Sequence, residues 1–448
     1  MLKKVLIANR GEIAVRVIRA CRDMGVGSVA VYAQEDKNSL HVQLADERIC
    51  IGSGGAKNSY LNQDRLIMAA LNTGADAVHP GYGFLSENAE FARKCREYGL
   101  IFIGPDPDVM DAMGNKSHAR AAMKAAGVPV IPGSDAVTDA DEAFRMASEI
   151  GYPIMIKAAF GGGGRGMRAV TDPEEFKLSF ELAQHESASA FGEDAMYLER
   201  LIESPRHVEV QIMADAHGNV VALGDRDCSV QRNHQKLIEE SPSPAVNAAT
   251  RKKMYEAAVL AAKTVGYTNA GTVEFILDRT GAFYFMEMNT RIQVEHPVTE
   301  MVTGVDLVTE QLRVAAGEEL SFTQQDVELR GHAIECRINA EIPEKNFMPS
   351  PGKITVLHLP GGAGVRVDTA IYTGYIVPPD YDSMIAKIIV HGLDRDAAIR
   401  KMRTALNETL IKGVQTNLDF QFRIMHNKVF CDGRADTGFV EQFIGGGK

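Results

Sequence analysis

The first hundred residues alternate short apolar runs with longer stretches in which apolar positions recur every three or four residues. Apolar runs at residues 4–8 and 28–32 predict strands, and the amphipathic stretch 12–24 between them predicts a helix. The same order continues with helices expected at 64–71 and 87–98 and strands at 75–79 and 100–103. Strands that alternate with helices in this way predict a parallel, doubly wound sheet.

The pattern changes after Gly104-Pro105. A helix expected at 116–126 runs into a boundary rich in proline and glycine at 127–133, and a charged linker at 318–330 precedes a last α+β section. The chain is too long for one ordinary core. We therefore expect an α/β and α+β multidomain protein, with an N-terminal domain at 1–112, a middle domain at 113–320 that contains a mobile lid at about 131–202, and a C-terminal domain at 331–446.

Residues 271–300 carry the densest set of polar candidates in the chain. Segments 272–277 and 282–289 are rich in β-branched and aromatic residues and flank a turn at 278–281, which predicts a hairpin. If Asp278 pairs with Gly281, Thr272 faces Glu287 and Glu274 lies diagonal to Glu287 on the same face. Asn289 would join that face because strand side chains alternate.

Two carboxylates and an amide oxygen on so apolar a face are costly to bury unless a cation neutralises them. Hard oxygen ligands of this kind suit Mg²⁺, so Glu274, Glu287 and Asn289 form a candidate metal site. The next turn adds an anion-binding arginine and a potential base, in the run Arg291, Gln293, Glu295 and His296. The alternative is an ordinary hairpin with solvent-facing glutamates, which the uninterrupted run of polar candidates disfavours.

A second candidate is the glycine loop at 159–167, which lies between two expected strands at 153–156 and 167–170. A Walker A loop or a Rossmann fingerprint would lead into a helix, so neither fits. Consecutive glycines let backbone N–H groups approach phosphate oxygens, and Lys157 and Arg165 favour this interpretation over a flexible hairpin tip. Lys116, at an expected helix start, is a weaker phosphate-binding candidate because most lysines lie on the surface.

Composition narrows the classes of function. The 448 residues carry a formal net charge of −11, which argues against nucleic acid or an anionic membrane as the main partner. No apolar stretch is long enough to span a bilayer. The six cysteines form no CxxC pair, which is typical of reduced thiols in a cytoplasmic protein.

Several sequence segments, taken together and in their order along the chain, resemble those of the biotin carboxylases, which belong to the ATP-grasp superfamily. The resemblance covers essentially the whole chain and rests on IANRGEIAVRVIRA, HPGYGFLSEN, GGGGRGM, RDCSVQRNHQK, MEMNTRIQVEHPVTE, ECRINAE, PSPGKI and YDSMIAK. Two positions depart from the family pattern. Phe160 stands where a small residue is usual, and Asn233 stands where an arginine is common.

The resemblance implies a role for each candidate. ATP would be held by Lys116, Lys157, Gly162, Gly163, Gly164, Glu199, Ile202, His207, Gln231 and His234. Mg²⁺ (or Mn²⁺) would be bound by Glu274, Glu287 and Asn289. Bicarbonate would contact Arg291, Gln293, the Val294 amide and Lys236. Glu295 would be the general base, and Arg337 would stabilise the enolate of biotin.

The resemblance also implies the reaction and its partners. Bicarbonate would attack ATP to give carboxyphosphate, and the carboxyl group would pass to biotin. No Ala-Met-Lys-Met attachment motif occurs, so biotin would be presented by a biotin carboxyl carrier protein. Carboxyltransferase subunits would then complete an acetyl-CoA carboxylase of fatty acid synthesis, and the chain itself would be a homodimer. The alternative acceptors are another acyl-CoA or pyruvate.

Three other functions compete with this one. A different ATP-grasp ligase that activates a carboxylate for an amine would not need a bicarbonate base such as Glu295. A non-catalytic nucleotide-binding scaffold would not need the full set of catalytic candidates. A Rossmann dehydrogenase is least compatible with the chain, because residues 7–12 lack the required glycine spacing.

Overall fold

The computed structural model describes residues 2–159 and 166–445, and it begins with a five-stranded parallel sheet in the order β3-β2-β1-β4-β5. The strands are β1 (Lys4–Ile7), β2 (Gly27–Ala33), β3 (Glu47–Gly52), β4 (Ala77–His79) and β5 (Ile101–Phe102). The helices of this unit are α1 (Gly11–Asp23), α2 (Leu40–Leu44), α3 (Gln63–Thr73), α4 (Ala89–Glu97) and α5 (Pro107–Gly114). The predicted parallel, doubly wound sheet is confirmed.

This sheet forms because its central strands are mainly apolar and are buried on both faces. Val5, Leu6 and Ile7 of β1 are fully buried. Helices α3 and α4 start where Asn62 and Asn88 accept hydrogen bonds from backbone N–H groups of the first turn. The sequence pattern did not predict β3, because its charged residues lie exposed at the edge of the sheet.

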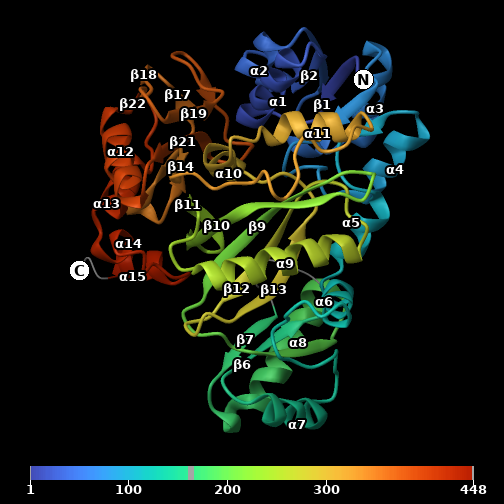
Figure 1. Cartoon of the computed structure of the whole chain (residues 1–448), viewed down its shortest axis with the longest axis vertical. Coiled ribbons are helices and arrows are strands. Elements are labelled where there is room, and N and C mark those ends of the chain that lie inside the picture. Colours follow the sequence, from blue (N-terminus) through green and yellow to red (C-terminus); the bar gives the residue numbers. More distant parts are fainter. Residues whose placement is uncertain (1, 160–165, 446–448) are drawn as a thin grey trace.

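A second sheet of eight strands runs through the middle of the molecule in the order β13-β12-β9-β10-β11-β14-β21-β19 (Figure 1). In chain order they are β9 (Arg206–Ala214), β10 (Val220–Arg232), β11 (Gln235–Ser241), β12 (Asn269–Leu277), β13 (Phe283–Asn289), β14 (His332–Asn339), β19 (Val365–Thr369) and β21 (Met384–Gly392). Every neighbouring pair is antiparallel. Three helices belong to this region: α9 (Ala248–Thr264), α10 (His296–Thr303) and α11 (Leu307–Ala315).

A third, three-stranded sheet lies apart from the others, at the bottom of Figure 1. It contains β6 (Ile154–Ala158), β7 (Met167–Val170) and β8 (Met196–Arg200), with α7 (Ala140–Ile150) and α8 (Phe176–Phe191) packed on it and α6 (Lys116–Ala125) beside it. The unit has its own core around Phe176 and Phe180. Strands β6 and β7 pair directly, as expected for a loop between strands. Phe160, Gly162, Gly163 and Gly164 lie outside the described residues.

The C-terminal region adds short strand pairs and helices around β14, β21 and β19. The pairs are β15 (Glu341–Ile342) with β16 (Met348–Pro349), β17 (Gly352–Lys353) with β20 (Ile376–Val377), and β18 (Val356–His358) with β22 (Leu410–Lys412). The helices are α12 (Arg395–Glu408), α13 (Leu418–His426), α14 (Lys428–Cys431) and α15 (Phe439–Gly445). Within the described ranges, no helix has both the length and the apolar run that crossing a membrane requires.

The hairpin β12–β13 exists as predicted, but its expected register is wrong. The Asp278 carbonyl accepts from the Gly281 N–H, but the Asp278 N–H donates to Ala282, so the strands pair from Ala282 onward and the turn holds three residues. A second irregularity between Glu274 and Phe275 shifts the register again. Thr272 therefore faces Asn289, and Glu274 lies directly opposite Glu287.

Candidate active site

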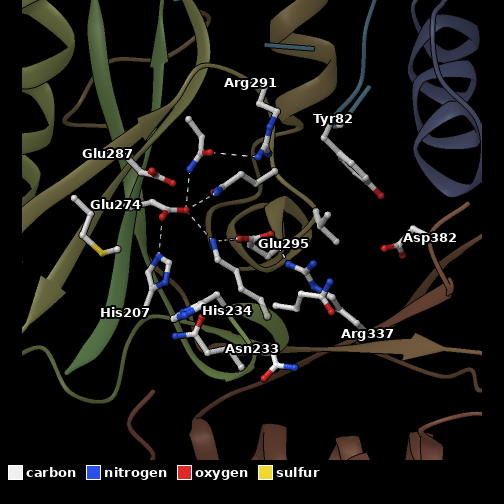
Figure 2. Close-up of a pocket in the computed structure, with 18 of the residues that line it drawn as sticks. Tyr82, His207, Asn233, His234, Glu274, Glu287, Arg291, Glu295, Arg337 and Asp382 are labelled. Carbon is white, nitrogen blue, oxygen red and sulfur yellow. Dashed lines mark hydrogen bonds and ion pairs between the residues drawn. The ribbon is translucent and has the colours of Figure 1, made fainter. Parts of the chain in front are cut away.

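A cavity of about 1050 Å³ is lined by residues of the N-terminal region, the three-stranded sheet and the eight-stranded sheet, and nearly all the candidate residues line it. Those that do are Lys116, Lys157, Glu199, His207, Gln231, His234, Lys236, Glu274, Glu287, Asn289, Arg291, Gln293, Val294, Glu295 and Arg337. Figure 2 shows the hairpin carboxylates on one side of this space and Arg337 on another, with Glu295 between them. Two described candidates, Ile202 and His296, are not among the lining residues.

The hairpin brings its three oxygen-bearing side chains into one patch. The amide nitrogen of Asn289 donates to Glu274 Oε1 over 2.8 Å. Glu287 lies beside Glu274 in Figure 2 and pairs with the Lys116 ammonium at 3.0 Å. The corrected register explains this proximity, because directly opposed side chains are the closest pairs across two strands.

The ammonium of Lys236 on β11 lies among three buried carboxylates. Its Nζ is 2.7 Å from Glu209, 3.0 Å from Glu274 and 2.6 Å from Glu295. Burial alone would lower the pKa of Lys236, but the surrounding carboxylates and Cys228 raise it well above its ordinary value. Lys236 is therefore a permanent cation at the centre of the cavity wall.

A second buried cation, Arg226 on β10, organises the wall from behind. It is fully buried, and its guanidinium donates to Glu209 and Gln293 over 2.6 Å each. The amide nitrogen of Gln293 then donates to Glu274 over 2.9 Å. A charge that makes several good hydrogen bonds can remain in the interior. The hydrogen bonds of Gln293 with Arg226 and Glu274 together fix its rotamer.

The turn from Gln293 to His296 presents a backbone donor to the cavity. The carbonyl of Gln293 accepts from the ring Nδ1 and the backbone N–H of His296 over 2.8 and 3.3 Å. Burial lowers the pKa of His296 well below its ordinary value, so the ring is neutral. Because a peptide is planar, fixing this carbonyl also fixes the Val294 N–H. None of the described residues accepts a hydrogen bond from that N–H.

The carboxylate of Glu295 lies between two cations from neighbouring strands. Lys236 contacts one oxygen and Arg337 on β14 donates to the other over 2.9 Å. Arg337 also donates to Glu239 over 2.6 Å. Burial would raise the pKa of Glu295, but Lys236, Arg337 and Arg226 hold it well below its ordinary value. Glu295 is therefore ionised near neutral pH.

Arg291 approaches the same region from the end of the hairpin. Its Nε donates to Glu87 over 2.9 Å, and its terminal nitrogen is 3.3 Å from the amide oxygen of Asn289. Figure 2 shows its side chain directed toward the hairpin patch. The guanidinium thus joins the carboxylate patch to the turn that contains Val294.

The opposite end of the cavity is built from the three-stranded sheet and the strands facing it. Lys157 on β6 pairs with Glu199 on β8 at 2.5 Å. Between this end and the hairpin patch, His207 on β9 lies 3.1 Å from Glu274. Burial would lower the pKa of His207, but Glu274 raises it above its ordinary value. Asn233 and His234 form the tight turn between β10 and β11, both with positive φ, and line the cavity.

Sequence reasoning missed several buried residues that contact the lining side chains from behind, including Glu209, Arg226 and Glu239. A signal for Glu209 was present, because His207, Glu209 and Gln211 alternate with apolar residues along β9. All three of these side chains are buried. Polar residues at spacing two within an apolar strand indicate a buried polar face, which in this chain reaches the cavity at His207.

Family models match the chain in three consecutive segments. They are described as the biotin carboxylase N-terminal domain at residues 1–110, the ATP-binding domain of the carbamoyl-phosphate synthase L chain at 115–323, and the biotin carboxylase C-terminal domain at 335–442. Biotin carboxylase 1 of Bacillus subtilis is 56% identical over 445 residues, which cover 99% of each chain. The chain belongs to the biotin carboxylase family. It is therefore an enzyme of that family, an ATP-dependent ligase.

Other biotin carboxylase family members resemble the chain nearly as closely. A pyruvate carboxylase subunit from Methanothermobacter thermautotrophicus is 55% identical over 444 residues, 99% of this chain and 90% of that one. The biotin carboxylase domain dimer of 2-oxoglutarate carboxylase from Hydrogenobacter thermophilus, solved with MgADP, ADP and bicarbonate, superposes with a TM-score of 0.93. It is 50% identical, with 99% and 98% of the two chains covered. The ATP-grasp fold predicted from the sequence is thereby confirmed.

Proposed function

We propose that this biotin carboxylase family member uses ATP and bicarbonate to carboxylate biotin on a separate carrier protein, by way of carboxyphosphate. The observation that carries the proposal is the ionised Glu295, held between Lys236 and Arg337 in the wall of the cavity. A base that must act on an anion needs nearby cations, because otherwise the two negative charges would repel each other.

Bicarbonate would be bound by the donors that meet beside Glu295: Arg291, Gln293, the Val294 N–H and Lys236. In this structure Lys236 is shared among three carboxylates, and a bound anion would compete with Glu295 for it. That competition would raise the pKa of Glu295 and make it a stronger base at the moment bicarbonate arrives. Glu295 would then take the bicarbonate proton as the oxygen attacks the γ-phosphorus of ATP.

The hairpin patch fits a divalent cation. Glu274, Glu287 and Asn289 supply hard oxygen ligands on adjoining strands, and the described donors to Glu274 are side chains of Lys236, Asn289 and Gln293. These three residues would hold Mg²⁺ (or Mn²⁺), which when bound offsets charge on the transferring phosphoryl group. Lys116, paired with Glu287, would contribute a further positive charge there.

The end of the cavity near the three-stranded sheet would hold ATP. We assign the phosphates to Lys116, Lys157 and the backbone of Gly162, Gly163 and Gly164. The remaining nucleotide contacts would come from Glu199, Ile202, His207, Gln231 and His234. The pairing of Lys157 with Glu199 supports this assignment, because it places a cation and a hydrogen-bond acceptor in one wall.

Once carboxyphosphate releases CO₂, phosphate would remove the proton from the ureido nitrogen of biotin. Arg337 would stabilise the resulting enolate, because its guanidinium already lies at the Glu295 edge of the cavity. Closure of the lid at about 131–202 would exclude water from carboxyphosphate.

We further propose the domain division 1–112, 113–320 and 331–446, a homodimer, and a cytoplasmic location. The six cysteines are all free, which fits a reducing compartment. We favour acetyl-CoA carboxylase as the complex, with a biotin carboxyl carrier protein and carboxyltransferase subunits as partners. The whole-chain match to a bacterial biotin carboxylase supports this choice, and the match to a pyruvate carboxylase subunit makes pyruvate the second candidate acceptor.

The test is ADP release from MgATP and bicarbonate, measured with and without free biotin. Stimulation by biotin that disappears without bicarbonate is the expected result. ADP release that depends on an added amine instead would contradict the proposal and indicate a different ATP-grasp ligase. Tight ATP binding without turnover, even with a biotinylated carrier domain present, would indicate a non-catalytic subunit.

A further inference from the structure

A buried lysine outside the proposed substrate-binding set is attached to the turn that carries the base. Lys387 on β21 is fully buried, and its ammonium donates to the backbone carbonyl of Val294 over 2.8 Å. The same nitrogen lies 3.0 Å from Glu12 on α1 and 3.9 Å from Asp368 on β19. One cation therefore joins the turn to both the N-terminal and the C-terminal region.

The contact with Val294 completes the constraint on the turn. His296 fixes the peptide plane between Gln293 and Val294, and Lys387 fixes the next plane, between Val294 and Glu295. Two successive peptide planes are thus held by side chains, the first by His296 within the turn and the second by Lys387 from outside it. The first sets the direction of the Val294 N–H, and the second sets where the Glu295 side chain leaves the backbone.

The sheet explains why this lysine can act together with Arg337. Lys387 lies directly opposite Arg337 in the pairing of β21 with β14, so both side chains project from the same face. Arg337 holds the carboxylate of Glu295 while Lys387 holds the backbone just before it. Neighbouring strands thereby fix both ends of the same residue.

On the other side, Lys387 is tied to a residue that lines the cavity. Glu12 accepts a hydrogen bond from the hydroxyl of Tyr82, whose ring lines the cavity opposite the hairpin patch (Figure 2). Burial alone would lower the pKa of Lys387, but Glu12, Glu335 and Asp368 raise it, so the charge persists. The chain of contacts runs from Tyr82 through Glu12 and Lys387 to Val294.

We propose that Lys387 is a positioning residue for the bicarbonate step. It aligns the Val294–Glu295 peptide so that the Val294 N–H and the Glu295 carboxylate meet the same anion. The inference rests on the proposed function, and it concerns the bicarbonate side of the cavity and not the nucleotide side. If Lys387 had only a structural role, its loss would weaken the binding of both substrates. A positioning role predicts that the KM for bicarbonate changes while the KM for ATP does not.

The test compares Michaelis constants for bicarbonate and ATP in Lys387→Met and in Glu12→Gln/Lys387→Met. The double variant removes the carboxylate that would otherwise be left buried without its cation. We expect the KM for bicarbonate to rise about tenfold or more in both, with the KM for ATP within about twofold of the parent, because small displacements of reacting groups have large effects. Lys4→Met is the matched control. Lys4 also donates to a carbonyl, that of Thr73, and pairs with Glu47, but far from the cavity.

If the neutral variants do not fold, the comparison is made with Lys387→Arg. This variant keeps the charge beside Glu12 but cannot place a single nitrogen at the same contacts. A parental bicarbonate KM in every folded variant, or an equal rise in both KM values, would overturn the inference. A parent enzyme without bicarbonate-dependent ADP release would instead contradict the proposed function, so the two failures are distinguishable.

Discussion

The two ends of the cavity are held in place by different kinds of contact. At the end where we propose that bicarbonate binds, Glu209, Glu295, Arg226 and Lys387 are almost fully buried. Arg226 pairs with Glu209, Lys236 joins Glu209 to Glu295, and Lys387 donates to the backbone just before Glu295. At the end where we propose that the nucleotide binds, the three-stranded unit has its own core, and its contacts with the eight-stranded sheet include single side-chain pairs such as Arg200 with Tyr284. A buried network fixes geometry before substrate binds, while a few local links allow a unit to move.

The largest effect should follow from removing the base at the fixed end. Glu295→Gln keeps the size of the side chain but removes its negative charge. We expect bicarbonate-dependent ATP cleavage to fall about 1000-fold or more, with the KM for ATP within about threefold of the parent. Steady-state ADP release measures both quantities. Unchanged turnover in this variant would show that Glu295 is not the base.

The next largest effect should appear in the stability of the three-stranded unit. Phe180 is fully buried in the core of that unit, so Phe180→Ala should cost about 3–5 kcal/mol there. Limited proteolysis should then cut within residues 131–202 and leave the eight-stranded sheet intact. Leu182→Ala, at a position 43% exposed on the same helix, is the matched control. If the eight-stranded sheet became as sensitive to the protease as the three-stranded unit, the two regions would not be independently stable.

Glu287→Ala should separate the metal patch from the network behind it. Glu287 is half-buried and is paired with Lys116, so its loss leaves no buried charge unpaired. We expect turnover at ordinary Mg²⁺ to fall about 100-fold and to recover partly at high Mg²⁺. Activity titrated against Mg²⁺ checks this. A parental metal response would defeat the ligand assignment.

A smaller, pH-dependent effect should come from Glu239 in the buried network. Burial raises its pKa from 4.5 to about 7, against the opposing effect of Arg337. The folded state then binds this proton more tightly than the unfolded state, so the associated stability is complete below pH 4.5 and is lost as the pH rises to 7. Relative to Glu239→Gln, the parent should lose on the order of 1–3 kcal/mol across that range. Thermal unfolding of both proteins at several pH values measures this loss. If the stability of the parent and of Glu239→Gln changed with pH in the same way, the prediction would be wrong.

The smallest effect should come from an ion pair on the surface of the three-stranded unit. Lys177 and Asp141 are in contact, and both side chains are exposed. Solvent screens such a pair, so Lys177→Met should leave the melting temperature and both KM values unchanged. A clear loss of stability would show that this unit, too, depends on its charged contacts.

The sequence could predict the parts of the structure that depend on local patterns along the chain. The α/β order of the first hundred residues and the hairpin could be predicted because each depends on local periodicity and turn residues. The register of the hairpin could not, because the turn holds one more residue than expected and an irregularity at Glu274 shifts the pairing again. The network around Arg226 and Lys387 was also missed. Its partners come from strands far apart in the chain, and no local pattern reports such contacts.

The pairing of β11 with β14 has a consequence for how the gene can be divided. These strands join the second and third matched segments in one hydrogen-bonded sheet, with Glu239 opposite Glu335. A chimaera that takes these two segments from different proteins would have to reproduce the pairing of β11 with β14 residue by residue. A truncated fragment would instead expose a strand edge to solvent and to other copies of itself. The two segments should therefore be inherited, exchanged and expressed as a single piece.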